Sequence, residues 1–206
     1  MFVTEISRYK GSTVCVMLSN GQKSAPLYIH RSIADRYSLS EGMEITAAQV
    51  RTIKRENDVR RARERALYLA EDMERSYKMM FDKLCANYPE DICHEVCDEL
   101  TQRGIIDDRR YARRYCDAAL KKYGEYRVKH ELWKRGISSE IIDELLEDMD
   151  DESSTETALR FLRSHIRRDR EPYKENKRLY DALARRGFSY DVITKAFAAL
   201  GEEDEL

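Results

Sequence analysis

Apolar residues along most of the chain recur at intervals of three and four, the spacing of one buried face on an α-helix. The pattern runs through Tyr111, Ala112 and Tyr115 in one segment and through Ala158 and Phe161 in another. Val3–Ser7 and Thr13–Leu18 instead alternate between apolar and polar residues or run β-rich, which favours short strands. We therefore predict a mainly α protein preceded by a small β-rich N-terminal domain.

The helical part contains a threefold internal repeat. Aligning Leu84, Leu132 and Leu183 gives steps of 48 and 51 residues. Self-similarity at such a period is typical of stacked supersecondary units that present an extended binding surface. Each unit reads as three helices, so about nine helices are expected in tandem three-helix repeats. The predicted division is a β-rich domain at 1–48, a helical linker at 49–61, repeats at 62–106, 107–152 and 153–200, and an acidic tail at 201–206.

Helix ends are marked within the repeats. Gly136 and Gly187 each follow a basic residue and are predicted to end the second helix of their repeats. Ser138 and Ser189 stand where the N-caps of the following helices should lie. The first repeat departs from this pattern, because it has Asn87 and one residue fewer where the others have Arg-Gly.

Within the N-terminal domain, Asn20-Gly21 predicts the turn of a tight hairpin. We expect strands at Val3–Ser7, Thr13–Leu18 and Leu27–Ile29, a short helix at Arg31–Tyr37 and a last strand at Glu44–Thr46.

The repeat motifs resemble those of the RecX family of recombination regulators. They read GIIDDRRYARRY (Gly104–Tyr115), then Gly124, then ELWKRGI (Glu131–Ile137) and ARRGFSYDVI (Ala184–Ile193). The resemblance covers 62–200. It implies a non-enzymatic protein that binds the RecA recombinase, chiefly its filament on single-stranded DNA. It also implies limitation of filament assembly and activity, and so negative modulation of homologous recombination and the SOS response.

Charge is segregated along the chain although the net charge is only −2. Arg109–Arg135 holds ten basic and three acidic residues, and Arg160–Arg186 holds ten basic and four acidic ones. Glu140–Glu156 between them holds nine acidic residues and no lysine or arginine. Stacked repeats would then carry a basic stripe and an acidic stripe. The alternative is solvated surface charge that keeps a repeat protein soluble.

The densest basic run is 109–114, whose arginines lie at spacings of three and four and so share one helical face. Such a face can pair phosphates or carboxylates, and the tyrosines of the same run are expected on its buried side. Internal pairing with Asp107, Asp108 and Asp117 is the rival role for these arginines. The candidate residues for binding the RecA filament or DNA are Arg109, Arg110, Arg113, Arg114, Lys121, Lys122, Arg127, Lys129, Lys134, Arg135, Arg185 and Arg186.

No catalytic motif is found. The chain has no glycine-rich phosphate loop, no G-x-S-x-G and no H-E-x-x-H. Asp107-Asp108 is read as a helix cap and dipole partner rather than a carboxylate pair. Cys93 and Cys97 supply only two of the four ligands of a closed zinc site, so buried reduced thiols are expected. We predict no enzyme activity, metal or cofactor.

No stretch approaches the ~20 apolar residues of a membrane span, and the first ten residues lack the apolar core of a signal peptide. Five cysteines without framework spacing favour a reducing cytosol. We therefore expect a cytoplasmic monomer whose partners are RecA and its single-stranded DNA filament, with weak direct DNA binding. The alternatives are a helical-repeat nucleic-acid-binding protein without RecA specificity, and a scaffold whose β-rich domain recruits another partner.

Overall fold

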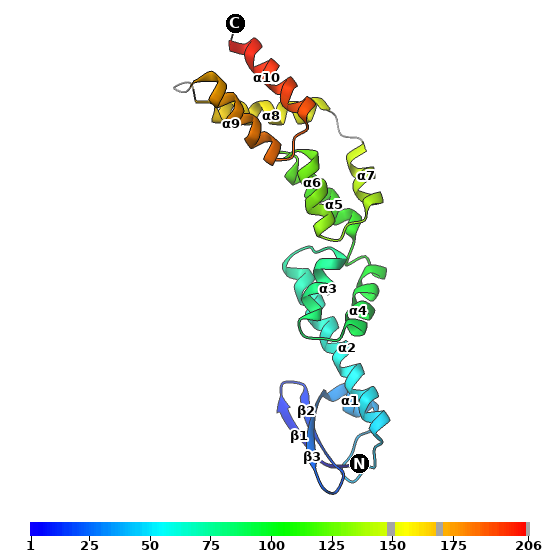
Figure 1. The fold of residues 1–206 in the computed structure, drawn as a ribbon. Coiled ribbons are helices and arrows are strands. Elements are labelled where there is room, and N and C mark those ends of the chain that lie inside the picture. The colour runs from blue at the N-terminus through cyan, green and yellow to red at the C-terminus, as the bar shows by residue number, and fades with distance from the viewer. Residues whose placement is uncertain (148–150, 168–170, 205–206) are drawn as a thin grey trace. The chain divides into compact units, whose positions relative to one another are not determined.

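The computed structural model describes residues 1–147, 151–167 and 171–204. Three predicted segments lie partly outside them: the second repeat at 148–150, the third repeat at 168–170 and the acidic tail at 205–206. The chain forms two compact units (Figure 1). Unit 1 comprises Met1–Met73 and Met80–Ile105, and unit 2 comprises Glu74–Met79 and Ile106–Leu206.

The N-terminal domain is a three-stranded antiparallel sheet of order β1-β2-β3, as its alternating pattern predicts. Its elements are β1 (Phe2–Lys10), β2 (Thr13–Ser19), β3 (Ser24–His30) and α1 (Arg31–Arg36). One sheet face packs on α1 and α2, with Val16, Ile29, Ile33 and Ile53 in the shared core. The expected last strand at Glu44–Thr46 is reduced to a single bridge between Phe2 and Glu44.

The β2–β3 hairpin is tight, but its turn lies one residue later than predicted. Gly21 has a φ of +88°, whereas Asn20 has no positive φ. The Asn20 side-chain oxygen instead accepts the backbone N–H groups of Gln22 and Lys23, at 3.0 and 2.8 Å. Asparagine therefore stabilises the turn from its flank through its side chain, and glycine alone supplies the positive φ.

The nine helices after the sheet domain, counted over the described ranges, match the predicted number. They are α2 (Ala47–Asp72), α3 (Tyr77–Cys85), α4 (Glu90–Gln102), α5 (Asp108–Ala119), α6 (Glu125–Lys134), α7 (Ser139–Glu147), α8 (Asp151–His165), α9 (Pro172–Arg185) and α10 (Tyr190–Asp204). Residues 49–61, expected as a linker, are continuous with the first helix of the first repeat, because α2 runs unbroken from a Thr46–Gln49 capping box.

Each repeat is organised around its aligned leucine. Leu84, Leu132 and Leu183 are all completely buried. Ser138 and Ser189 accept backbone N–H groups three residues on, at 3.4 and 3.2 Å, which confirms them as N-caps.

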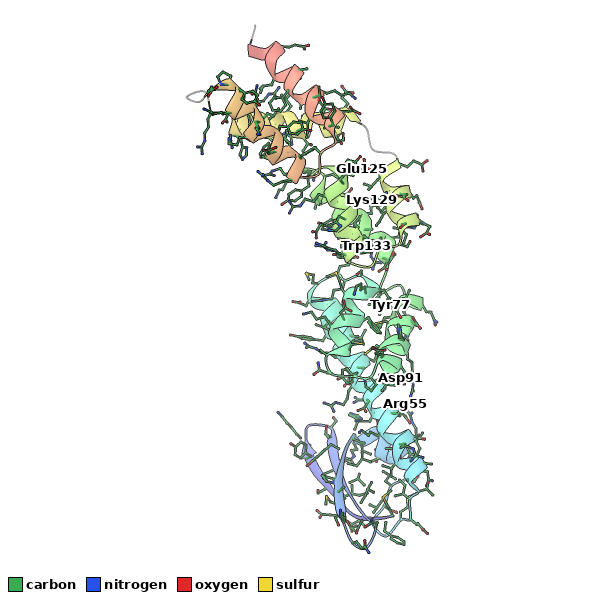
Figure 2. The ribbon with its side chains drawn as sticks, viewed as in Figure 1. Arg55, Tyr77, Asp91, Glu125, Lys129 and Trp133 are labelled. Carbon is green, nitrogen blue, oxygen red and sulfur yellow. The ribbon has the colours of Figure 1, made fainter. Side chains whose placement is uncertain are left out.

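In unit 1, Arg55 of α2 binds Asp91 and Glu95 of α4, at 3.2 and 2.6 Å (Figure 2). Arg63 of α2 likewise binds Glu99 of α4, at 2.6 Å. These arginines of α2 therefore serve the packing of the first repeat.

Candidate interaction surface

The adjacent acids at the start of α5 cap two different helices. Asp107 accepts the Arg110 backbone N–H at 2.9 Å and caps α5, as predicted. Asp108 turns the other way and accepts the Tyr77 backbone N–H at 2.7 Å, at the start of α3. Burial raises the pKa of Asp108. Both carboxylates therefore act on helix N-termini.

All four arginines of α5 are exposed, as the helical spacing predicts. Three of them are nevertheless paired within unit 2. Glu74 binds both Arg110, at 2.7 Å, and Arg114, at 2.9 Å, and Arg109 is paired with Glu144. Hydrogen bonds from Arg110 and then Arg114 hold the pKa of Glu74 below its ordinary value.

The internal partners of this face are therefore mainly Glu74 and Glu144. Of the three predicted acids, only Asp107 lies within ion-pair distance, at 3.7 Å from Arg110. Arg113 has no carboxylate partner among the described residues.

The third repeat joins the second through backbone groups at Gly124 and Gly187 and at their neighbours Tyr126 and Arg186. The Gly124 N–H donates to the Arg186 carbonyl at 3.0 Å, and the Tyr126 N–H donates to the Gly187 carbonyl at 3.2 Å. The last carbonyls of α9 thus satisfy the first amides of α6, groups that a helix leaves unpaired at its ends. A β-carbon on Gly124 would lie 2.2 Å from the Gly187 oxygen, so only glycine permits this approach.

The second repeat meets the start of α3 in the same way. The Ser76 hydroxyl donates to the Arg135 carbonyl at 2.5 Å and accepts the Met79 N–H at 3.2 Å. A β-carbon on Gly136 would lie 2.4 Å from the Lys78 β-carbon. The Arg-Gly pair therefore ends a helix and also contacts the preceding repeat. The first repeat has no repeat before it to contact, which gives a physical reason for the absence of Arg-Gly there.

The joint between the second and third repeats gathers cations around Tyr123. The Arg127 guanidinium lies 4.2 Å from the centre of the Tyr123 ring. Arg186 lies over Phe161 at 4.3 Å and donates to the Lys122 carbonyl at 3.4 Å. We call the following five residues the junction cluster: Lys121, Lys122, Arg127, Arg185 and Arg186.

No carboxylate oxygen of the described residues lies within 4 Å of a side-chain nitrogen in the junction cluster. The remaining predicted cations are paired. Lys129 binds Asp143 at 2.5 Å, and Glu131 accepts from Arg135 at 2.6 Å and contacts Lys134 at 3.9 Å. The candidate set therefore divides into ion-paired residues and a group without a carboxylate partner among the described residues, namely Arg113 and the junction cluster.

Exposed aromatic residues on α6 were absent from the sequence-based candidates. Tyr126 and Trp133 are each 65% exposed, and His130 stacks on Trp133 with ring centres 6.3 Å apart. Figure 2 shows Lys129 and Trp133 along the same helix. The sequence could have predicted their exposure, because Tyr126 and Trp133 are seven residues apart and lie on the helix face opposite the buried Val128 and Leu132. Exposed tryptophan and tyrosine beside cations are typical of binding hot spots.

The cysteines are placed as predicted. Cys93 and Cys97 are buried, and burial raises the pKa of each thiol to about 12. Within the described ranges, no group of three or more metal-ligating side chains comes together. None of the helices described is long and apolar enough to cross a bilayer.

Comparison with known proteins decides the family. Two family models match, for the second three-helix domain of RecX at residues 107–146 and the third at 151–197. "Regulatory protein RecX" of Chlorobium phaeobacteroides is 33% identical over 141 residues, covering 67% of this chain and 92% of the relative. The chain belongs to the RecX family. The family resemblance in the repeat motifs is thereby confirmed, and RecX relatives are named as regulatory proteins rather than enzymes.

Other RecX proteins agree over most of the chain. The regulatory protein of Clostridioides difficile is 25% identical over 183 residues, covering 86% of this chain and 85% of the relative. A crystal structure of regulatory protein RecX superposes with a TM-score of 0.68 at 21% identity, covering 93% and 96% of the two chains. RecX from Lactobacillus salivarius gives 0.62 at 23% identity, covering 71% and 98%. These structures show the fold, including tandem three-helix repeats.

Proposed function

We propose that this protein binds the RecA recombinase as a filament on single-stranded DNA and limits filament assembly and activity. It acts as a cytoplasmic monomer without a cofactor, and it restrains recombination and the DNA-damage response. Membership of a family of regulatory proteins supports this role. The observation that carries it is the junction cluster, where five cations have no internal carboxylate partner among the described residues.

A nucleoprotein filament offers the ligands that such a surface needs. Its DNA exposes phosphates, and a protein groove exposes carboxylates, and arginine binds both through two parallel hydrogen bonds. The paired arginines of α5 would have to give up Glu74 or Glu144 before they could bind a new partner. Losing these ion pairs would offset most of the binding free energy that the new contacts supply. The junction cluster, whose cations have no carboxylate partner among the described residues, and the exposed Trp133 favour the second and third repeats as the docking surface.

RecA-driven ATP hydrolysis on single-stranded DNA tests the proposal. We expect slower hydrolysis at ratios well below one protein per RecA, because blocking a growing filament end affects many subunits. Inhibition only near equal ratios would replace end-blocking with lateral coating, and no inhibition would contradict the proposed function.

Charge reversal then tests the surface. Lys121→Glu/Lys122→Glu alters two exposed cations of the junction cluster, and we expect it to weaken filament binding with an unchanged melting temperature. Lys54→Glu/Lys83→Glu is the matched control, because it makes the same charge change at two exposed lysines of unit 1 that have no ion pair with another described residue. Equal loss of binding in both variants would mean that net charge, rather than the junction cluster, governs binding.

A further inference from the structure

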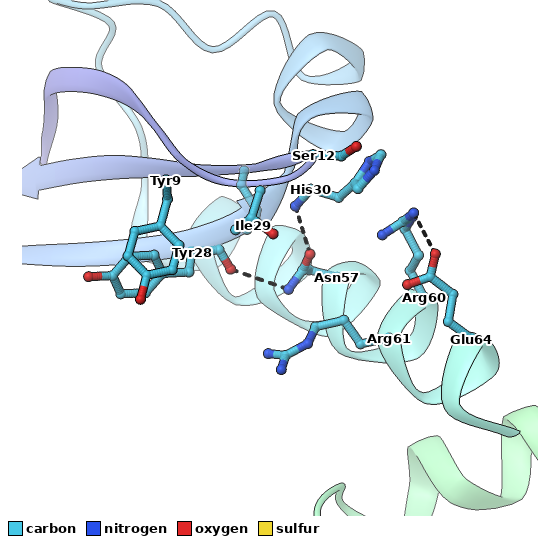
Figure 3. Close-up of a pocket in the computed structure, with 10 residues that line it drawn as sticks. Tyr9, Ser12, Tyr28, Ile29, His30, Asn57, Arg60, Arg61 and Glu64 are labelled. Atoms are coloured by element: carbon cyan, nitrogen blue, oxygen red, sulfur yellow. Dashed lines mark hydrogen bonds and ion pairs between the residues drawn. The ribbon is translucent and has the colours of Figure 1, made fainter. Parts of the chain in front are cut away.

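The sheet of unit 1 carries two exposed tyrosines on the face that its core leaves open. Tyr9 of β1 and Tyr28 of β3 are 63% and 45% exposed, with ring centres 4.7 Å apart (Figure 3). The neighbouring Ile29 points to the opposite face and is completely buried. The tyrosine pair is therefore a surface feature rather than part of the domain core.

The pair lies in a pocket of about 520 Å³ whose other wall is α2. Arg60 and Arg61 of α2 line this wall, and Arg60 is held by Glu64 at 2.6 Å. Arg61 has no carboxylate partner in the described part of the chain. Figure 3 shows its guanidinium on the tyrosine side of the helix, away from Arg60 and Glu64. One cation of the pocket is thus available to an incoming anion.

The wall is fixed in place by a buried asparagine. Asn57 of α2 is 4% exposed, accepts the His30 backbone N–H at 2.9 Å and donates to the Tyr28 carbonyl at 3.3 Å. These are the edge groups of β3 that an added peptide strand would use. Asn57 therefore holds the arginine wall against the sheet and blocks strand addition there.

Cations and aromatic rings continue along α2. Arg61 also lines a second hollow with Arg65, whose guanidinium lies 5.4 Å from the centre of the exposed Tyr68 ring. Spacings of four and three place Arg61, Arg65 and Tyr68 on one face of the helix. Asp58 is the one acid lining this second hollow.

We propose that this face of unit 1 binds single-stranded nucleic acid, with bases stacked on Tyr9 and Tyr28 and phosphates at Arg61 and Arg65. Stacking on aromatic rings tolerates any base, and a row of cations follows the backbone. The blocked edge of β3 disfavours an extended peptide as the occupant. This inference does not rest on the proposed function, since it concerns free nucleic acid in the absence of RecA.

The test is fluorescence anisotropy of the full chain with a labelled oligothymidylate of about 20 nucleotides, longer than typical single-strand sites. We expect Tyr9→Ala and Tyr28→Ala each to weaken binding at least about fivefold, the low end of stacking effects. Tyr28→Phe should bind like the wild type, because its ring remains. Tyr173→Ala is the control, since Tyr173 is 73% exposed on α9 of unit 2.

Two further arms separate stacking from charge. Arg61→Gln/Arg65→Gln should reduce the slope of log affinity against log salt by about 1.4, at about 0.7 per phosphate contact. An abasic oligonucleotide should bind the wild type and Tyr28→Ala equally, because it has no bases to stack. Oligouridylate and oligodeoxyuridylate carry the same base and differ only in the sugar, so weaker binding of the ribose form would assign the site to DNA.

Failure of the chain to bind oligothymidylate at low salt would overturn the proposal. Wild-type affinity in both Tyr9→Ala and Tyr28→Ala would overturn it equally. Because RecA is absent from these assays, either result leaves the ATPase test of the proposed function standing on its own.

Discussion

Replacing Gly124 with alanine tests the joint between the second and third repeats. The backbone of Gly124 has φ −78° and ψ 166°, which alanine adopts freely, so the change acts only through the added β-carbon. That atom would lie 2.2 Å from the Gly187 oxygen, where ordinary contact begins near 3.4 Å. The neighbour is backbone, so the two chains must separate by about an ångström.

Such a separation breaks the two backbone hydrogen bonds of the joint, which are now 3.0 and 3.2 Å long. Each bond contributes about 0.5–1.5 kcal/mol net, and overpacking adds about 1–3 kcal/mol. Gly124→Ala should therefore lower the free energy of unfolding by about 2–6 kcal/mol. The melting temperature should fall by roughly 4–24 °C, at about 2–4 °C per kcal/mol for a chain of this size.

Calorimetric melting and amide hydrogen exchange of Tyr126 are the assays, because the Tyr126 N–H donates across the joint. Gly201→Ala is the matched control: Gly201 lies in α10 with no atom within 4 Å of a β-carbon, so this change should stabilise slightly. Gly104→Ala, at φ +68° with equally open space, isolates the cost of a left-handed backbone. If Gly124→Ala melts like Gly201→Ala, with Tyr126 still protected, the close approach of the two glycines is refuted.

Three further predictions concern charged groups of unit 2. The lowered pKa of Glu74 means that its ionised form stabilises the fold above the ordinary value of 4.5, and that this contribution is lost as the pH falls through the lower folded value. The advantage of wild type over Glu74→Gln, about 1 kcal/mol or less, should therefore shrink in melts as the pH is lowered below 4.5. Asp108→Ala should cost about 1 kcal/mol through loss of the α3 cap, whereas Asp108→Asn, which keeps an acceptor, should cost less in urea titrations. Arg110→Glu sets a carboxylate against Glu74 and should lower the melting temperature. Arg113→Glu should lower it less, because Arg113 has no ion pair among the described residues and only helps to lower the pKa of Glu144.

The local features of the fold could be predicted from the sequence because each depends on near neighbours. Apolar spacing predicts the helices, Ser138 and Ser189 predict caps, and Gly136 and Gly187 predict helix ends, with φ of +79° and +84° in the structure. The hairpin turn was misplaced by one residue, since a side-chain contact at Asn20 competes with its tolerance of positive φ.

The candidate site was predicted only in part, because its charges are decided by distant partners. Nothing local to α5 indicates that Glu74, 36 residues before Arg110, neutralises two of its arginines. Likewise, Lys122 and Arg186 are 64 residues apart and meet only because the repeats join at Gly124 and Gly187. The basic run in the sequence therefore overstated how many arginines of α5 lack an internal carboxylate partner. It also gave no sign that the cations of the junction cluster gather around Tyr123.

The way in which α9 and α6 are joined explains why the cations of the junction cluster lack carboxylate partners among the described residues. Backbone amides and carbonyls connect α9 to α6, and the glycines leave no room for side chains between them. A joint built from ion pairs would consume arginines and lysines, as the contact of Arg110 and Arg114 with Glu74 does. A joint built from backbone groups uses no cation in an ion pair, so the cations beside it have no carboxylate partner among the described residues. Stability and binding can then be changed separately, the first at Gly124 and the second at Lys121 and Lys122.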